Sequence, residues 1–147
     1  MGPRNGAMYF TLESEAKEAG LCLKWPSRLP NTRQALAAAE WVRRHQPEIF
    51  RQFHNDLFAA HFSLGQDIGD PFVIERYATD LGINVADLHA ALSDDSALKY
   101  VTECEMIGLR YGVQGTPAWL IADRLVSGIF PATEFERLAQ AATQVGR

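Results

Sequence analysis

The sequence predicts an α/β chain in which a series of helices is followed by a β-hairpin and a final helix. Apolar residues recur at steps of three and four between residues 32 and 112, which is the period of amphipathic helices. After Gly112 the pattern changes to short apolar runs separated by turn residues, which is typical of strands. We expect a helical part at about 32–112 and a closing part at about 113–145, within a single domain over residues 1–147.

The first expected helix covers residues 11–19, with Thr11 as its N-cap and Gly20 at its end. The apolar alternation of residues 21–25 then indicates a short extended segment. Pro30 belongs to the loop that follows, because proline fixes φ and removes a hydrogen-bond donor.

Five further helices are expected before the change of period. They run from Thr32 to His45, from Pro47 to Gly65, from Pro71 to Gly82, from Asn84 to Leu92, and from Asp94 or Asp95 to Gly112. The second of these carries an aromatic stripe. Its members recur at helical spacing, which is what a buried helix face shows, so we interpret them as core. The stripe consists of Phe50, Phe53, Phe58 and Phe62.

The closing part is predicted to be a hairpin followed by a helix. Residues 118–121 form an apolar run of strand length, 122–124 a turn, and 125–127 a second strand; the last helix carries Phe135 on its apolar face. A two-stranded hairpin is marginal alone in water. Its inner face must therefore be covered by the helices, by a second copy of the chain, or by strands that this sequence does not contain.

The bulk composition excludes some classes of function. The formal net charge is -4, and no Lys/Arg block interleaved with aromatic residues occurs, so the electrostatic footprint of a nucleic-acid-binding protein is missing. No run of about 18 apolar residues is present, and the first residues lack a signal-peptide pattern. We expect a soluble cytoplasmic protein that binds neither nucleic acid nor membrane.

Cys22 and Cys104 are the only cysteines, and they form neither a C-x-x-C pair nor a zinc-type spacing. Cys104 lies between two glutamates, whose negative charges would disfavour a thiolate if they lay close to it. We interpret both residues as buried structural thiols, because a free cysteine behaves as a small hydrophobe.

Several motifs, taken in their order and spacing, resemble those of one known family. They are Trp25-Pro26, Leu29-Pro30-Asn31-Thr32-Arg33, Phe58-Ala59-Ala60-His61-Phe62, Asp67-Ile68-Gly69-Asp70, Gly112-Val113-Gln114-Gly115-Thr116-Pro117 and Val126-Ser127-Gly128. With them the chain resembles the DsbA-like, thioredoxin-fold proteins. It is most similar to the cytoplasmic branch that contains FrnE-type disulfide oxidoreductases, 2-hydroxychromene-2-carboxylate isomerases and kappa-class glutathione transferases. The resemblance implies a truncated thioredoxin-like α/β fold, with residues 32–112 as a large all-helical insertion and residues 113–145 as its C-terminal half.

The resemblance also implies a substrate loop. In the family the proline of this loop is cis, and Pro117 takes that position. Thr116 would then present its backbone N–H and C=O to an extended peptide or to glutathione, as an added strand. Asn31 and Arg33 correspond to a segment near the substrate in the glutathione-dependent branch. The alternative is that Asn31 caps a helix and Arg33 is solvated.

The N-terminal βαβ unit of the family, with its C-x-x-C or serine nucleophile, has no counterpart before Thr11. We therefore expect no catalytic residue and no bound metal or cofactor. Glutathione is expected as a ligand only because the family resemblance implies it. Three functional hypotheses follow: a DsbA-family protein inactive in redox chemistry on its own, a non-catalytic homodimeric interaction module, or a fragment of a longer oxidoreductase.

Overall fold

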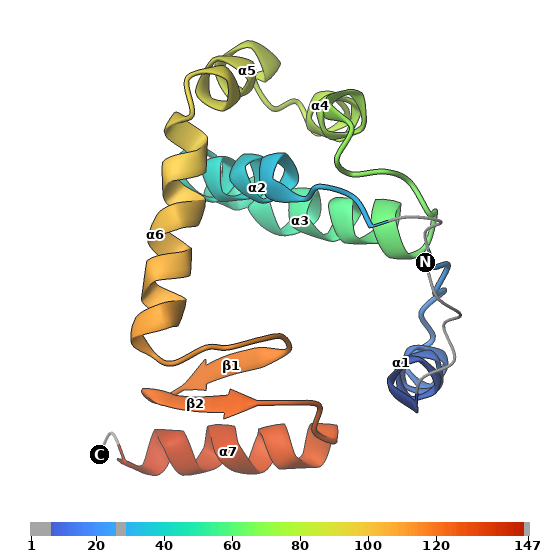
Figure 1. Cartoon of the computed structure of the whole chain (residues 1–147), viewed down its shortest axis with the longest axis vertical. Helices are drawn as coiled ribbons and strands as arrows, with labels where there is room; N and C mark the ends of the chain where they lie inside the picture. The colour runs from blue at the N-terminus through green and yellow to red at the C-terminus, as the bar shows by residue number, and fades with distance from the viewer. Residues whose placement is uncertain (1–6, 26–28, 146–147) are drawn as a thin grey trace. The chain divides into compact units, whose positions relative to one another are not determined.

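The computed structural model of the chain describes residues 7–25 and 29–145. The chain divides into two compact units, residues 1–101 and residues 102–147 (Figure 1). The expected single domain over 1–147 stays a prediction. Within the described residues, no helix is long and apolar enough to cross a membrane.

The first unit is all-helical. Its helices are α1 (Ala7–Glu18), α2 (Arg33–His45), α3 (Pro47–Phe62), α4 (Pro71–Asp80), α5 (Val85–Ser93) and the start of α6 (Ser96–Arg110). The helical prediction for this part of the chain is confirmed, with one correction at the beginning. Thr11 is not an N-cap, because α1 begins four residues earlier and the Thr11 hydroxyl donates to the carbonyl of Ala7 at 3.1 Å.

Two helix starts follow directly from local sequence. Asp70 precedes a proline in the first turn of α4, and its carboxylate accepts a hydrogen bond from the Phe72 N–H at 3.0 Å. Asn84 caps α5 by accepting from the N–H groups of Ala86 and Asp87, at 3.1 and 3.2 Å. Each cap satisfies donors that have no partner inside the helix.

The core of the first unit lies among α2, α3, α4 and α5. The alanines of α2 allow its neighbours to approach closely, and the largest fully buried side chains are Phe53, Ile74, Leu88 and Val42. Our interpretation of the aromatic stripe is therefore correct only in part. Phe53 is core, but Phe58 is 52% exposed and Phe62 is 37% exposed. Both residues lie on a face of α3 that points away from the core.

The second unit contains the rest of α6, a hairpin and the terminal helix α7 (Ala132–Val145). Strand β1 (Ala118–Ile121) pairs antiparallel with β2 (Arg124–Ser127), and the two strands make up the only sheet in the described residues. The predicted hairpin is thus confirmed. Its turn is formed by two residues with positive φ, 46° at Ala122 and 61° at Asp123, which is the type I′ geometry that fits the twist of paired strands.

One face of the hairpin packs on α7. The ring of Trp119 lies edge-on to that of Phe135, with 4.6 Å between centroids, and the register places Val126 beside Trp119 on the same face. Side chains alternate along a strand, so Leu120 and Leu125 lie on the opposite face. Leu120 is 46% exposed. Within its own unit, then, the hairpin has one covered and one open face.

Candidate functional site

The Thr116–Pro117 loop joins α6 to β1, and its peptide bond is cis, as the resemblance implies. The loop follows Gly112, whose φ of 78° lets the chain leave the end of α6. The Tyr111 hydroxyl donates to the Asp123 carboxylate at 3.3 Å. This hydrogen bond ties the end of α6 to the turn of the hairpin.

The hydrogen bonds of the hairpin determine which way the backbone of β1 faces. The N–H of Gly128 donates to the carbonyl of Pro117 at 3.0 Å, and Trp119 lies opposite Val126 two residues further along the register. In an antiparallel ladder, alternate residues bond to the partner strand while the residues between them face away. The backbone groups of Ala118 and Leu120 therefore point outward from the hairpin.

The outer edge of β1 is open in the described part of the chain. No described residue makes a hydrogen bond to the backbone N–H or C=O of Thr116, and no described strand pairs with β1 on the side away from β2. An unpaired strand edge is a template for another extended segment. We refer to Thr116, Ala118 and Leu120 as the β1 edge.

Asn31 and Arg33, the other two predicted substrate-binding residues, lie at the start of α2. The side-chain oxygen of Asn31 accepts a hydrogen bond from the Arg33 N–H at 3.2 Å, so Asn31 organises the first turn of the helix. A Cβ atom built on Gly69 would lie 2.9 Å from the Asn31 carbonyl oxygen. The two motifs from the sequence, around Asn31 and around Gly69, are thus in direct backbone contact.

The N-cap position of α2 is Thr32, whose side chain makes no capping hydrogen bond, so Asn31 contacts the first turn from one residue before the cap. A role in binding substrate stays a prediction for both Asn31 and Arg33. Asn31 also lines a hollow of about 540 Å³ at this junction. Its other lining residues are Leu29, Pro30, Asp67, Gly69, Asp70 and Pro71. Asn31 and Arg33 belong to the first unit, whereas Thr116 and Pro117 belong to the second.

The interpretation of the cysteines as buried thiols is wrong. Cys22 and Cys104 are both exposed, and they do not form a disulfide. Cys104 lies on a stretch of α6 whose side chains are almost all exposed, and Cys22 lies on the extended segment after α1. A short apolar run predicts burial only if another element covers it.

The chain matches the family model of the DSBA-like thioredoxin domain over residues 1–142. It belongs to the DSBA-like thioredoxin family. Comparison with curated proteins finds no match. The family is related to thiol–disulfide oxidoreductases and has a thioredoxin fold, so the fold class predicted from the sequence is confirmed at this level. In this DSBA-like chain the fold consists mostly of helices, with a small two-stranded sheet.

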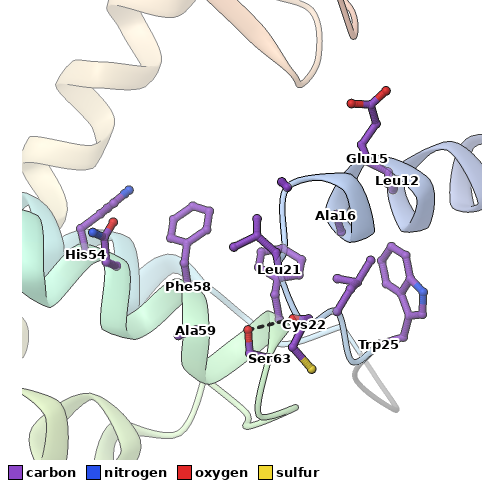
Figure 2. Close-up of a pocket in the computed structure, with 14 residues that line it drawn as sticks. Leu12, Glu15, Ala16, Leu21, Cys22, Trp25, His54, Phe58, Ala59 and Ser63 are labelled. Atoms are coloured by element: carbon purple, nitrogen blue, oxygen red, sulfur yellow. Dashed lines mark hydrogen bonds between the residues drawn. The ribbon is translucent and has the colours of Figure 1, made fainter. Parts of the chain in front are cut away.

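Sequence reasoning did not identify a groove between α1 and α3 (Figure 2). The rings of Phe50, His54, Phe58 and Phe62 lie four residues apart on one helix, but this spacing alone does not indicate a groove. We assigned the phenylalanines to the core because exposed and buried stripes have the same period. Only the position of neighbouring elements distinguishes them.

Proposed function

We propose that this DSBA-like protein binds an extended peptide, or glutathione, along the β1 edge, and that it has little or no thiol–disulfide exchange activity on its own. The open backbone of Thr116, Ala118 and Leu120 is the observation that carries the binding proposal. Main-chain hydrogen bonds to such an edge provide affinity with little dependence on sequence. Thr116 begins the edge, and Leu120 offers an exposed apolar side chain beside it.

The proposed lack of exchange activity rests on the cysteines. Exchange requires an activated thiolate, usually at a helix N-terminus, with a resolving thiol close by. Cys104 lies inside α6 and Cys22 lies in an extended segment, so neither occupies such a position. The sequence contains no C-x-x-C pair.

Insulin reduction tests the catalytic half of this proposal. We expect the purified chain to reduce insulin no faster than the dithiol reductant alone, and the Cys22→Ser and Cys104→Ser variants to behave in the same way. A rate well above that background, abolished by one of the two substitutions, would contradict the proposal. It would also identify the reacting thiol.

Two proline variants test the binding half. Ala118 and Ser127 are register partners whose N–H groups face opposite outer edges of the hairpin, so proline at either position removes no hydrogen bond of the β1–β2 ladder. We expect Ala118→Pro to weaken binding of a short unstructured peptide by about fivefold to tenfold, the value of roughly one hydrogen bond. Ser127→Pro is the control and should bind normally. Equal loss in both variants would place the peptide elsewhere.

The assignment to the branch of FrnE-type oxidoreductases, 2-hydroxychromene-2-carboxylate isomerases and kappa-class glutathione transferases is also a proposal, supported by the motifs around Asn31 and Gly69. A cytoplasmic location is part of the same proposal. Titration with reduced glutathione distinguishes between the alternative functions within this branch. Saturable binding at the β1 edge would favour the glutathione-dependent members, and binding of peptide alone would favour the FrnE-type members.

A second candidate function is a non-catalytic homodimeric module. The exposed Leu120 side chain and the open β1 edge favour it, because pairing of two such edges would bury both features. Light scattering provides the test. A dimer that Ala118→Pro converts to monomer would support this function, and a wild-type monomer would rule it out.

A further inference from the structure

A partly exposed tryptophan lies in the middle of the β1 edge. Trp119 is paired with Val126 of β2, so its backbone faces the partner strand. The residues before and after it, Ala118 and Leu120, carry the backbone groups that face outward. The Trp119 residue is 36% exposed. A peptide that pairs with the β1 edge must therefore pass directly in front of this residue.

The geometry of an antiparallel ladder brings the Trp119 side chain closest to an added strand. Residues that exchange two hydrogen bonds have Cα atoms about 5.5 Å apart, whereas the pairs between them have Cα atoms about 4.5 Å apart and closer side chains. Ala118 and Leu120 would form the hydrogen-bonded pairs, because their N–H and C=O groups face outward. Trp119 would form the closer pair between them.

The Trp119 ring is held in place by an aromatic cluster. Phe135 of α7 lies edge-on to it, with 4.6 Å between centroids, and Phe130 lies edge-on to Phe135 at 6.1 Å. Val126 flanks Trp119 on the β2 side, while no described strand lies on the side of the β1 edge. A supported tryptophan that keeps exposed surface is the type of residue that often dominates a binding interface.

The other face of the hairpin offers less selectivity to a bound peptide. Peptide residues opposite Ala118 and Leu120 would direct their side chains to the face that lies away from Trp119. Ala118 has only a methyl group to offer. Leu120 is 46% exposed, but it would belong to a hydrogen-bonded pair, in which the side chains lie farther apart. The residue opposite Trp119 should therefore determine most of the sequence preference.

These features distinguish between the two ligands proposed for the β1 edge. Strand β1 carries no charged side chain, so the surface beside the edge offers apolar contacts and no ion pair. Glutathione has no large apolar side chain and could not use the Trp119 ring. A longer peptide could pair with the backbone and also place an aromatic side chain against Trp119, because aromatic pairs are favourable across neighbouring strands.

We propose that the ligand of the β1 edge is an extended peptide that carries an aromatic side chain at the residue opposite Trp119. The peptide ring would extend the cluster that Trp119 forms with Phe135 and Phe130. This inference rests on the peptide binding proposed above and specifies the class of peptide.

The test uses a short threonine- and serine-rich host peptide with phenylalanine, alanine or lysine at its central residue, titrated by calorimetry. We expect the phenylalanine peptide to bind about two- to twelvefold more tightly than the alanine and lysine peptides, as expected for one aromatic contact. Equal affinities that are still reduced by Ala118→Pro would overturn this inference and leave the peptide site itself in place. Absence of binding by all three peptides would overturn both.

Two variants and one spectroscopic contact assign the preference to Trp119. Trp119→Val keeps a strand-forming residue and should abolish the preference for phenylalanine, whereas the control Leu125→Val, on β2 and on the other face, should retain it. In the wild-type complex, nuclear Overhauser contacts should join the peptide ring to the Trp119 indole, a readout that does not depend on the folding of any variant. Absence of these contacts, or a preference that survives Trp119→Val, would contradict the proposal.

Discussion

At the scale of single residues, the contact between Gly69 and Asn31 ties together two motifs that lie far apart in the sequence. A Cβ atom on Gly69 would lie 2.9 Å from the Asn31 carbonyl oxygen and 3.1 Å from its nitrogen, and both are backbone atoms that cannot rotate away. We predict that Gly69→Ala destabilises the first unit by about 1–3 kcal/mol, the usual cost of overpacking. Urea unfolding followed by circular dichroism measures the change.

Gly108→Ala is the control for this prediction. Gly108 is inside α6 without positive φ, and its added Cβ would only make ordinary contact with Val113 at 3.7 Å. Alanine is the better helix former there, by about 0.5–1 kcal/mol. A Gly69→Ala protein as stable as wild type would show that the loop at Asp67–Asp70 does not support the start of α2.

The hairpin turn gives a second prediction at this scale. Ala122 has φ of 46°, a left-handed conformation that costs an ordinary side chain about 1–2 kcal/mol. Asparagine tolerates this conformation and is favoured in type I′ turns. We predict that Ala122→Asn slows hydrogen exchange at the Trp119 and Val126 amides, which lie within the ladder; unchanged exchange would show that the turn does not limit opening of the hairpin.

At the scale of elements, α2 carries two ion pairs that share the carboxylate of Glu40. Arg43 donates from Nε to Glu40 at 2.8 Å, and Arg44 donates from Nε at 3.0 Å. The hydrogen bond from Arg43 is the main cause that lowers the pKa of Glu40 below its ordinary value of 4.5, against a smaller opposing effect of burial. Glu40 thus contributes stability while it is ionised.

The stabilisation of the folded state by Glu40 depends on pH. Because the folded state holds the pKa of Glu40 below 4.5, the stabilisation is complete above that pH and is lost as the pH falls from there toward the lower folded-state value. We predict that Glu40→Gln costs about 1 kcal/mol near neutral pH and progressively less in acid. Urea unfolding of both proteins across this range is the measurement, and a difference that stays constant with pH would contradict it.

The sequence was most informative about secondary-structure elements. Apolar spacing predicted the helices, the change of period after Gly112 predicted the hairpin, and Asp70 and Asn84 were predicted as helix caps. The same spacing did not reveal which stripes are covered. Phe53 is core and Phe58 is exposed, because α2 lies against one side of α3 and a groove lies against the other.

At the scale of the whole molecule, the thioredoxin fold could be predicted only through the order of motifs along the chain, and the family match confirms it. The cis bond at Pro117 was likewise implied by resemblance, since spacing carries no information on peptide isomers. The α1–α3 groove could not be predicted, because it is formed by elements whose apposition no local pattern encodes. The function is therefore proposed from a surface feature, the open β1 edge.

The most direct test of the central claim is an amide-shift map of nitrogen-15-labelled protein titrated with a short unstructured peptide. We predict saturable shifts at Thr116, Ala118 and Leu120, with smaller changes at Trp119, whose amide belongs to the ladder with β2. Shifts confined to other parts of the chain, or none at saturating peptide, would contradict the claim that the β1 edge is the binding site.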